Sequence, residues 1–381
     1  MQNYGRLLRP WMVVLILCLA YLVAILARND GDPRSFVVVG SRFETGDPDG
    51  SEGYDGQFAY YIALDPVRAA DRLDVPAYRY QRILYPLLAR WLAFGRPGWL
   101  PWTMLLVNVV ALMAGTALME SLLTGYGVSR WYGLVYGLYA GQLMSVRLDL
   151  NEPLSIGLSV AALWALDRER PGLSAVLMAF AVLAKETALV FAGACGFYLL
   201  LTAGWRPALR FGLVIVAPFA LWQIALWRWL GNPGLGSGGA MATPFELIPL
   251  MGLWRIGATS LPALLLYGAI LGPLIVLPTL WALVRTGRDI AQRRWHPVTL
   301  ALFANALVLL FLPHSSWREF LAMLRLSAAL VATILLYAGL RRDRRILNYS
   351  FGWLAALAFL IKEGPGAVSY THLTLPTTPY V

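Results

Sequence analysis

The chain has 381 residues, of which 59% are hydrophobic and only 14% are charged, and its net charge is +10. This composition is too apolar for a water-soluble core covered by a polar surface, so the sequence predicts a protein that crosses a membrane several times. The arginines are concentrated in short segments between apolar runs, a pattern that orients helices in a bilayer, and we therefore expect no nucleic-acid partner. Cys18 and Cys195 both lie inside apolar runs, which disfavours a disulfide framework and a cysteine-rich metal site.

Apolar runs that are long enough to be membrane spans recur along the chain. A span needs roughly 20 apolar residues, and fewer where flanking side chains reach the interface. On this measure we expect an all-α, polytopic transmembrane helical bundle with about eleven spans, the first of them an uncleaved anchor rather than a signal peptide. The expected spans cover residues 10–27, 99–123, 131–146, 153–166, 172–184, 187–204, 209–230, 260–284, 297–313, 320–340 and 346–361.

The C-terminal residues have a different character. Residues 368–377, VSYTHLTLPT, resemble the translation of a transposase adapter used in sequencing libraries. We therefore expect residues 1–367 to form a single transmembrane domain and residues 368–381 to be a non-native tail, beyond which the native C-terminus is missing.

The positions of arginine predict how the chain is threaded through the membrane. When the N-terminus is placed on the inner side, successive inner turns receive arginine and few acidic residues, as the positive-inside bias requires. We therefore expect a multi-pass protein whose N-terminus is cytoplasmic. The arginines of these inner turns are Arg6, Arg9, Arg130, Arg168, Arg170, Arg206, Arg210, Arg285, Arg288, Arg293, Arg294, Arg341, Arg342, Arg344 and Arg345.

One long polar segment, residues 28–96, follows the first span and is expected on the extracytoplasmic side. It holds ten of the chain's 21 carboxylates. Its first part is rich in Gly, Asp, Pro and Ser and is expected to be irregular. Residues 56–64 are expected to form a short helix with Asp55 as the N-cap. Apolar positions at helical spacing predict a second helix over residues 80–94, lying in the membrane interface.

Short turns on the same side each pair a cation with an anion. Charged groups cost about 2.5–3.5 kcal/mol each at the centre of a span and less at its ends, so a cluster needs partners or a water-filled cavity. Each group taken alone is explained as well by solvation or capping at a helix end. Their gathering on one face beside an acidic loop favours a shared site. The set is Arg147, Asp149 and Glu152; Lys185 and Glu186; Arg318 and Glu319; Lys362 and Glu363.

The turn from Arg147 to Pro153 is the most informative of these. Proline fits the first turn of a helix, and the free N–H groups of such a helix start attract a phosphate. Lys185-Glu186-Thr187 repeats the arrangement before the next helix. The alternative is that these basic side chains reach the interface only to be solvated. The cations expected to converge on a phosphate are Arg147, Lys185, Arg318 and Arg325.

Asp55 is the leading candidate for a general base. A base that accepts a proton from a sugar or lipid hydroxyl must be a carboxylate near the bilayer surface, within hydrogen-bond reach of the acceptor. Asp55 meets this description, and capping of the helix over 56–64 is its alternative role. Asp30 and Asp32, which follow the first span directly, are the competing bases.

Two groups of residues resemble the GT-C superfamily of membrane glycosyltransferases. Tyr54-Asp55-Gly56-Gln57-Phe58, followed by YYIA, resembles the Trp-Asp-x-x-Trp/Tyr plus Ile-Ala pattern in the first luminal loop of GPI mannosyltransferases, with tyrosine in place of the tryptophan. The span that begins at Pro153, the inner turn over 167–170 and residues 183–187 resemble the paired helices of that superfamily. YDGQF together with residues 77–86, AYRYQRILYP, is similar to bacterial membrane proteins linked to cell-surface glycopolymer formation.

This resemblance implies a GT-C-like fold and a hexosyltransferase of the bacterial inner membrane. Its donor would be a polyprenyl-phosphate sugar, its acceptor a cell-envelope glycan or lipid on the extracytoplasmic face, and the sugar carbon would be inverted. Asp55 would be catalytic, with Asp149 and Glu152 orienting the acceptor or the cations. The implied substrate-binding residues are Tyr54, Gln57, Arg79, Gln81, Arg82, Arg147, Lys185, Glu186, Arg318 and Arg325.

Two other functions stay open at the level of sequence. A transporter or flippase of a lipid-linked saccharide would need ionisable residues near mid-membrane and inverted repeats, and neither is visible. The third hypothesis is a non-catalytic component of an envelope glycopolymer complex. The sequence identifies no cofactor and no metal motif, and it leaves open a divalent cation, Mg²⁺ or Mn²⁺, because clustered carboxylates bind hard cations.

Overall fold

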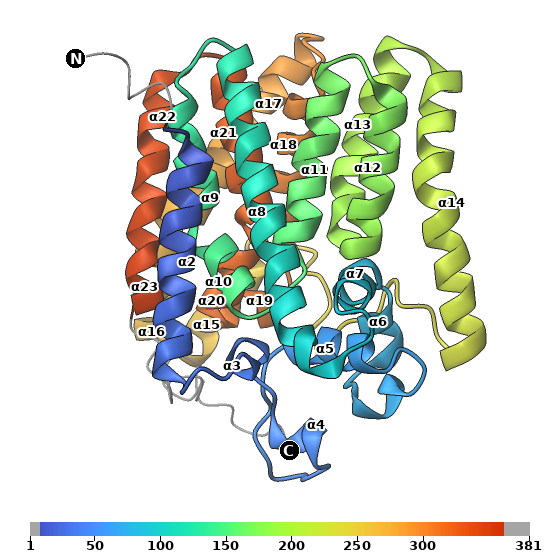
Figure 1. Ribbon diagram of the computed structural model, residues 1–381. Helices are drawn as coiled ribbons and strands as arrows, with labels where there is room; N and C mark the ends of the chain where they lie inside the picture. Colours follow the sequence, from blue (N-terminus) through green and yellow to red (C-terminus); the bar gives the residue numbers. More distant parts are fainter. Residues whose placement is uncertain (1–7, 362–381) are drawn as a thin grey trace.

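The computed structural model describes residues 8–361, and within that range every regular element is a helix (Figure 1). The prediction of an all-α chain is confirmed for these residues. Lys362, Glu363 and the expected tail over 368–381 lie outside the described range.

Several helices have the length and composition of membrane spans. In residues 8–361, four helices pass this test, and a bent pair of helices would make a fifth. The four are Pro10–Arg28, Pro97–Gly125, Trp205–Leu230 and Leu261–Ala291, and the pair is Phe320–Leu326 with Ala328–Leu340, bent by 41°. Shorter apolar helices, Pro171–Ala184, Glu186–Thr202 and Pro297–Leu310, lie where three further spans are expected.

The long helices run side by side in one bundle (Figure 1). Its members are α2 (Pro10–Arg28), α8 (Leu100–Gly125), α11 (Glu152–Asp167), α12 (Pro171–Ala184), α13 (Leu189–Thr202), α14 (Trp205–Leu230), α16 (Leu261–Leu271), η5 (Gly272–Val276), α17 (Leu277–Ala291), α18 (Pro297–Leu310), α20 (Phe320–Leu326), α21 (Ala328–Leu340), α22 (Arg344–Ser350), η6 (Phe351–Leu357) and α23 (Ala358–Ile361). Helix α11 packs against α8 and α12, and α18 packs against α13, α17 and α21. These contacts bury the apolar side chains that form the main core.

The apolar run over 131–146 is not one continuous helix. It forms three short ones, η3 (Arg130–Tyr132), α9 (Gly133–Gly137) and α10 (Ala140–Arg147). Close contacts with neighbouring helices explain why glycine occurs here. A Cβ at Gly137 would lie 2.6 Å from a side-chain methyl carbon of Val14 in α2, and a Cβ at Gly141 would lie 2.1 Å from the backbone oxygen of Leu324 in α20. Thus α9 packs closely against α2, and α10 packs closely against α20.

The turns that the arginine pattern assigns to one side do meet at one end of the bundle. Tyr126 donates a hydrogen bond to Asp167 (3.0 Å), and Arg342 donates one to the backbone oxygen of Tyr126 (3.0 Å). Tyr132 donates to Asn348 at 2.7 Å. The long polar segment after α2 covers the opposite end (Figure 1).

This polar segment folds into short helices that close the end of the bundle. They are α3 (Arg34–Val37), α4 (Ser41–Glu44), α5 (Gly56–Leu64), η1 (Ala69–Arg72), α6 (Pro76–Tyr80), α7 (Leu84–Leu92) and η2 (Pro97–Trp99). Helix α5 has the bounds expected from the sequence. The helix expected over 80–94 is shorter in the structure, where it corresponds to α7 over residues 84–92. Arg82 lies in the turn between α6 and α7, and α6 packs against α14 while α7 packs against α8.

Candidate functional site

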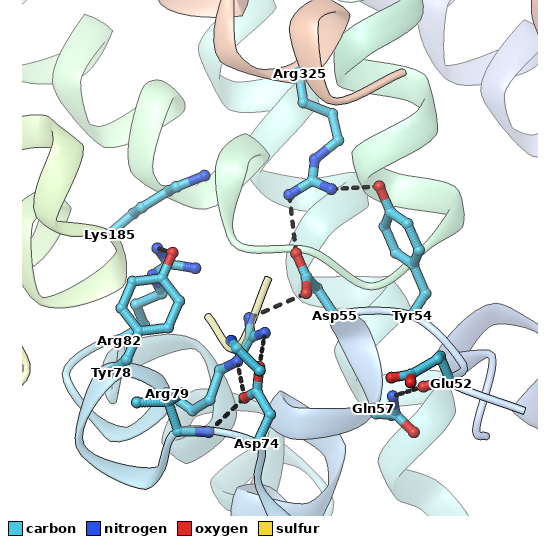
Figure 2. Close-up of polar contacts among 12 residues, drawn as sticks. Glu52, Tyr54, Asp55, Gln57, Asp74, Tyr78, Arg79, Arg82, Lys185 and Arg325 are labelled. Carbon is cyan, nitrogen blue, oxygen red and sulfur yellow. Dashed lines mark hydrogen bonds and ion pairs between the residues drawn. The ribbon is translucent and has the colours of Figure 1, made fainter. Parts of the chain in front are cut away.

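Asp55 lies at the start of α5, and its side chain does not cap that helix. Its carboxylate points instead toward two arginines, with Oδ1 3.1 Å from Arg79 Nη1 and Oδ2 3.3 Å from Arg325 Nη2. Figure 2 shows Asp55 between these two guanidinium groups. The capping role is therefore not the one that Asp55 has in this structure, and its carboxylate is available at the cavity described below.

Gly56 allows α5 to approach the turn that precedes α11. A Cβ at this position would lie 2.2 Å from the backbone oxygen of Leu148. The neighbouring residue Asp55 is held near Glu152 by this close approach, because Leu148 and Glu152 belong to the same turn. Glycine at position 56 is thus a structural requirement for the site.

Replacing Gly56 with alanine is expected to destabilise the protein by about 1–3 kcal/mol, because the methyl group must displace a backbone oxygen. The shift of α5 would also reduce any activity that depends on Asp55. The measurement is the unfolding midpoint of the purified protein in detergent. Gly98→Ala is the control, since a Cβ there has no atom within 4 Å; equal midpoints for the two variants would contradict the prediction.

A second carboxylate, Glu152, joins two cations at the first residue of α11. Its Oε1 atom accepts hydrogen bonds from Lys185 Nζ at 2.7 Å and from Arg325 Nη2 at 3.0 Å. The side chains of all three residues are buried, that of Glu152 being only 4% exposed. Because Arg325 also pairs with Asp55, the two carboxylates and two of the cations form one continuous network.

Two further ion pairs border this network. Arg82 donates to both oxygens of Glu186, at 2.8 and 2.5 Å, and to the hydroxyl of Tyr78. Arg79 donates to both oxygens of Asp74, at 2.7 and 2.8 Å. Paired bonds of this kind fix the plane of a guanidinium group. They therefore hold Arg79 and Arg82 in place on the side of the network that α6 forms.

The charged groups line a cavity at this end of the bundle. Its apolar wall is formed by side chains of α5, by Leu150 and by Pro86 of α7. Its polar wall consists of Asp55, Arg79, Arg82, Asn151, Glu152 and Arg325. Its volume is about 20 Å³. One water needs about 10–15 Å³ by the same measure, so in this conformation the cavity has room for a water but not for a sugar ring. A substrate would need the lining side chains to move apart.

Cations and carboxylates balance in this region. Burial by itself would raise the pKa of Asp55, but the positive charges of Arg79, Arg325 and Arg82 outweigh this effect and lower the pKa to about 2. Burial would likewise raise the pKa of Asp74, and the hydrogen bonds and charge of Arg79 lower it. Both carboxylates are thus ionised at neutral pH, and each arginine has a negative partner.

These lowered pKa values predict a loss of stability in acid. A carboxylate whose pKa is lower in the folded state stabilises the protein above its unfolded pKa, near 3.8, and loses that effect as the pH falls toward the folded value. We expect the free energy of unfolding to fall between about pH 4 and pH 2. Asp74→Asn should be less stable at pH 6 and less sensitive to acid than the exposed control Asp71→Asn. Identical pH curves would contradict the assignment.

Two residues near the site were missed in the sequence. Asp74 orients Arg79, and Tyr78 accepts a hydrogen bond from Arg82. Glu319 belongs to the set of turn charges expected to share a site but was given no role of its own. It accepts a hydrogen bond from Tyr54 at 2.9 Å, and Arg325 donates to the same tyrosine hydroxyl. Tyr78 lies within residues 77–86, which carry part of the resemblance, whereas no local motif marks Asp74.

Several expected site residues lie elsewhere. Arg147 donates to the backbone oxygen of Ser35 (2.9 Å), and its guanidinium carbon lies 5.9 Å from the Phe36 ring. Asp149 is fully buried, accepts a hydrogen bond from Tyr85 at 3.3 Å, and does not line the cavity.

Three other expected site residues, Gln57, Gln81 and Arg318, also lie outside the cavity lining. Gln57 accepts from Gly40 N and donates to Glu52 O, so it holds the loop and points away from the cavity (Figure 2). Gln81 is buried and lies close to Gly234. A Cβ added at Gly234 would be only 2.7 Å from the Cβ of Gln81. Arg318 does not line the cavity.

Metal binding has no support from the arrangement of the described residues. No three His, Cys, Asp or Glu side chains in residues 8–361 are grouped so that they could hold a metal ion. The carboxylates of the network are instead interleaved with guanidinium groups. A divalent cation stays a prediction from the clustered carboxylates of the sequence alone.

Comparison with known proteins does not assign the chain to a family. No family model, no curated protein and no solved structure matches it. The function must therefore be argued from the site itself.

Proposed function

We propose that this chain is a membrane glycosyltransferase that transfers a sugar from a polyprenyl-phosphate donor to a cell-envelope glycan or lipid. The observation that carries the proposal is the position of Asp55. This carboxylate shares one cavity with Arg79 of the same polar loop and with Glu152 and Arg325, which come from distant parts of the chain. An acid beside several fixed cations suits a reaction in which a hydroxyl loses a proton and a phosphate leaves.

The proposed chemistry assigns a task to each charge. Asp55 accepts the proton of the acceptor hydroxyl as the acceptor oxygen forms its bond to the anomeric carbon. The bond from that carbon to the phosphate oxygen breaks, and polyprenyl phosphate leaves with both bonding electrons. Arg79, Arg82 and Arg325 stabilise the leaving phosphate, since preorganised cations stabilise developing negative charge. Helix α11 starts at Glu152 on the cavity wall, and a helix start favours phosphate.

The low pKa of Asp55 is an apparent difficulty, because a carboxylate with a pKa of about 2 is a weak base. The donor phosphate would resolve it. A phosphate that binds Arg79 and Arg325 competes with Asp55 for the same N–H groups and adds negative charge beside it. Both effects raise the pKa of Asp55. In this proposal the base becomes effective only when the donor is bound, which limits loss of the donor to water.

Opening of the cavity is a further requirement of the proposal. The segment between α14 and α15 (Met251–Thr259) reaches the charged network, since Ala240 N donates to Asp74 Oδ2 at 3.2 Å. The same segment lies close to Arg79, because a Cβ at Gly239 would be 3.1 Å from Arg79 Nη2. Movement of this glycine-rich segment would free Arg79 and widen the cavity.

The proposal includes a GT-C-like arrangement of about eleven spans, with shorter helices such as α11 and α13 among them. It places the protein in a bacterial inner membrane, with a cytoplasmic N-terminus and the Asp55 cavity on the extracytoplasmic face. The arginine-rich turns at the other end of the bundle support this orientation.

The test is sugar transfer by the purified full chain. The protein is reconstituted in vesicles and incubated with a radiolabelled polyprenyl-phosphate sugar and an envelope extract. Appearance of label in a glycan or lipid that depends on the protein supports the enzyme. Movement of intact donor across the vesicle membrane without incorporation would identify a transporter instead. Neither incorporation nor movement, with donors of several sugars, would favour the non-catalytic component.

A further inference from the structure

A second cavity lies at the other end of the bundle, where α17 ends. Its walls are Arg285, Arg288, Asp289, Gln292 and Arg294, and its volume is about 240 Å³. This is far more than the roughly 10–15 Å³ that one water requires. The cavity is remote from the Asp55 network, because α17 ends at the arginine-rich end of the bundle (Figure 1).

The charges of this cavity do not balance. Asp289 is buried and already has partners, since Arg341 Nη2 lies 2.6 Å from its Oδ2 and Tyr337 donates to the same oxygen. Arg294 lies 3.7 Å from its other oxygen. Arg285 and Arg288 form no ion pair with any described residue, and both are exposed. The cavity therefore presents an excess of positive charge, which calls for an anion.

An apolar surface leads to these arginines. Leu277, Leu280 and Val284 are exposed on α17, and Arg288 continues the series at the same helical spacing. Residues spaced by three or four positions lie on one face of a helix. One face of α17 thus offers apolar contact over its first turns and guanidinium groups at its end. The helix belongs to a segment with the length and hydropathy of a membrane span.

We propose that this face binds an anionic phospholipid. The phosphate of the headgroup lies in the cavity against Arg285 and Arg288, and an acyl chain lies along Leu277, Leu280 and Val284. Basic pockets beside transmembrane helices recognise phosphate-bearing headgroups in this way. A soluble anion would use the arginines but not the apolar face, so the joined surface favours a lipid.

The experiment measures lipid affinity of the full chain in detergent by native mass spectrometry. The probes are cardiolipin, phosphatidylglycerol and phosphatidylcholine, each titrated separately. The wild type is expected to bind the two anionic lipids at least about tenfold more tightly than phosphatidylcholine, and Arg285→Ala with Arg288→Ala to lose about 30-fold of that affinity. Arg168→Ala with Arg170→Ala is the matched control, since both arginines are exposed in another turn of the same end.

Three results would overturn the proposal. Equal losses in the two double variants would mean that any surface arginine attracts the lipid. Equal affinity of the wild type for all three lipids would exclude recognition of charge. Displacement of the lipid by an equal concentration of glycerol phosphate would show that the apolar face of α17 contributes nothing. Loss confined to the Arg285 and Arg288 variant, without displacement by glycerol phosphate, supports the proposal.

Discussion

Replacement of Asp55 by asparagine is expected to lower sugar transfer by about 100-fold or more while leaving insertion into the membrane unchanged. Asparagine keeps the size of the side chain but cannot accept the proton of the acceptor, and general-base catalysis contributes about 10²–10⁴ to a rate. The measurement is the initial rate of incorporation of label from a polyprenyl-phosphate sugar at saturating donor. Membrane yield and chromatographic behaviour of the variant show whether it inserts and folds normally.

Asp32→Asn is the matched control, because Asp32 is the competing base from the same polar loop. In the structure Asp32 is exposed and accepts a hydrogen bond from the backbone of Arg34, away from the charged network. Its replacement should leave transfer within about twofold of the wild type, as expected for an exposed position. Full activity in Asp55→Asn, or loss in Asp32→Asn alone, would remove Asp55 from the mechanism.

Replacement of Glu152 by glutamine is expected to lower the free energy of unfolding by about 3 kcal/mol. Removal of one partner from a buried ion pair leaves the other charge uncompensated, which costs about 3–5 kcal/mol. Here Lys185 and Arg325 share the lost charge, and Arg325 still has Asp55, so the lower end of that range applies. Unfolding of the purified protein by sodium dodecyl sulfate measures the change.

Two further variants test whether the loss of stability in Glu152→Gln comes from the buried ion pairs. Glu44→Gln breaks an exposed pair with Arg34 and should cost less than about 1 kcal/mol. The double variant Glu152→Gln with Lys185→Met removes the buried anion together with one of its two cations. It should therefore lose less stability than the sum of the losses in the two single variants. A Glu152→Gln protein as stable as Glu44→Gln would mean that the network does not stabilise the fold.

The proposed proton-accepting role and the expected structural role thus fall to different carboxylates of one network. Both side chains line the cavity, but that of Asp55 is 37% exposed, whereas that of Glu152 is almost fully buried. Arg325 joins them, so its orientation depends on both. This division is a physical reason to expect that Asp55→Asn affects rate more than stability and that Glu152→Gln affects both.

The sequence by itself determined the all-α character of the described residues, the presence of apolar helices of span length, and the end of the bundle where charges gather. Long apolar runs can bury their backbone polar groups in a membrane only as helices or closed barrels, and their length here favours helices. The bounds of α5 followed from a polar start at Asp55 and from Asp65-Pro66 at its end, which are local signals. The grouping of the arginine-poor turns at one end of the bundle followed from the alternation of arginine-rich and arginine-poor turns.

Only the tertiary structure decided which charges meet. Asp55 and Arg325 are 270 positions apart, Glu152 and Arg325 are 173 apart, and Arg82 and Glu186 are 104 apart. Such contacts depend on how neighbouring helices are rotated and shifted against one another, and no local pattern encodes that. Arg147 and Asp149 were expected in the same site because they share a turn with Glu152. The backbone at Asp149 has a positive φ of 50°, so the turn directs side chains of adjacent residues to different sides of the chain.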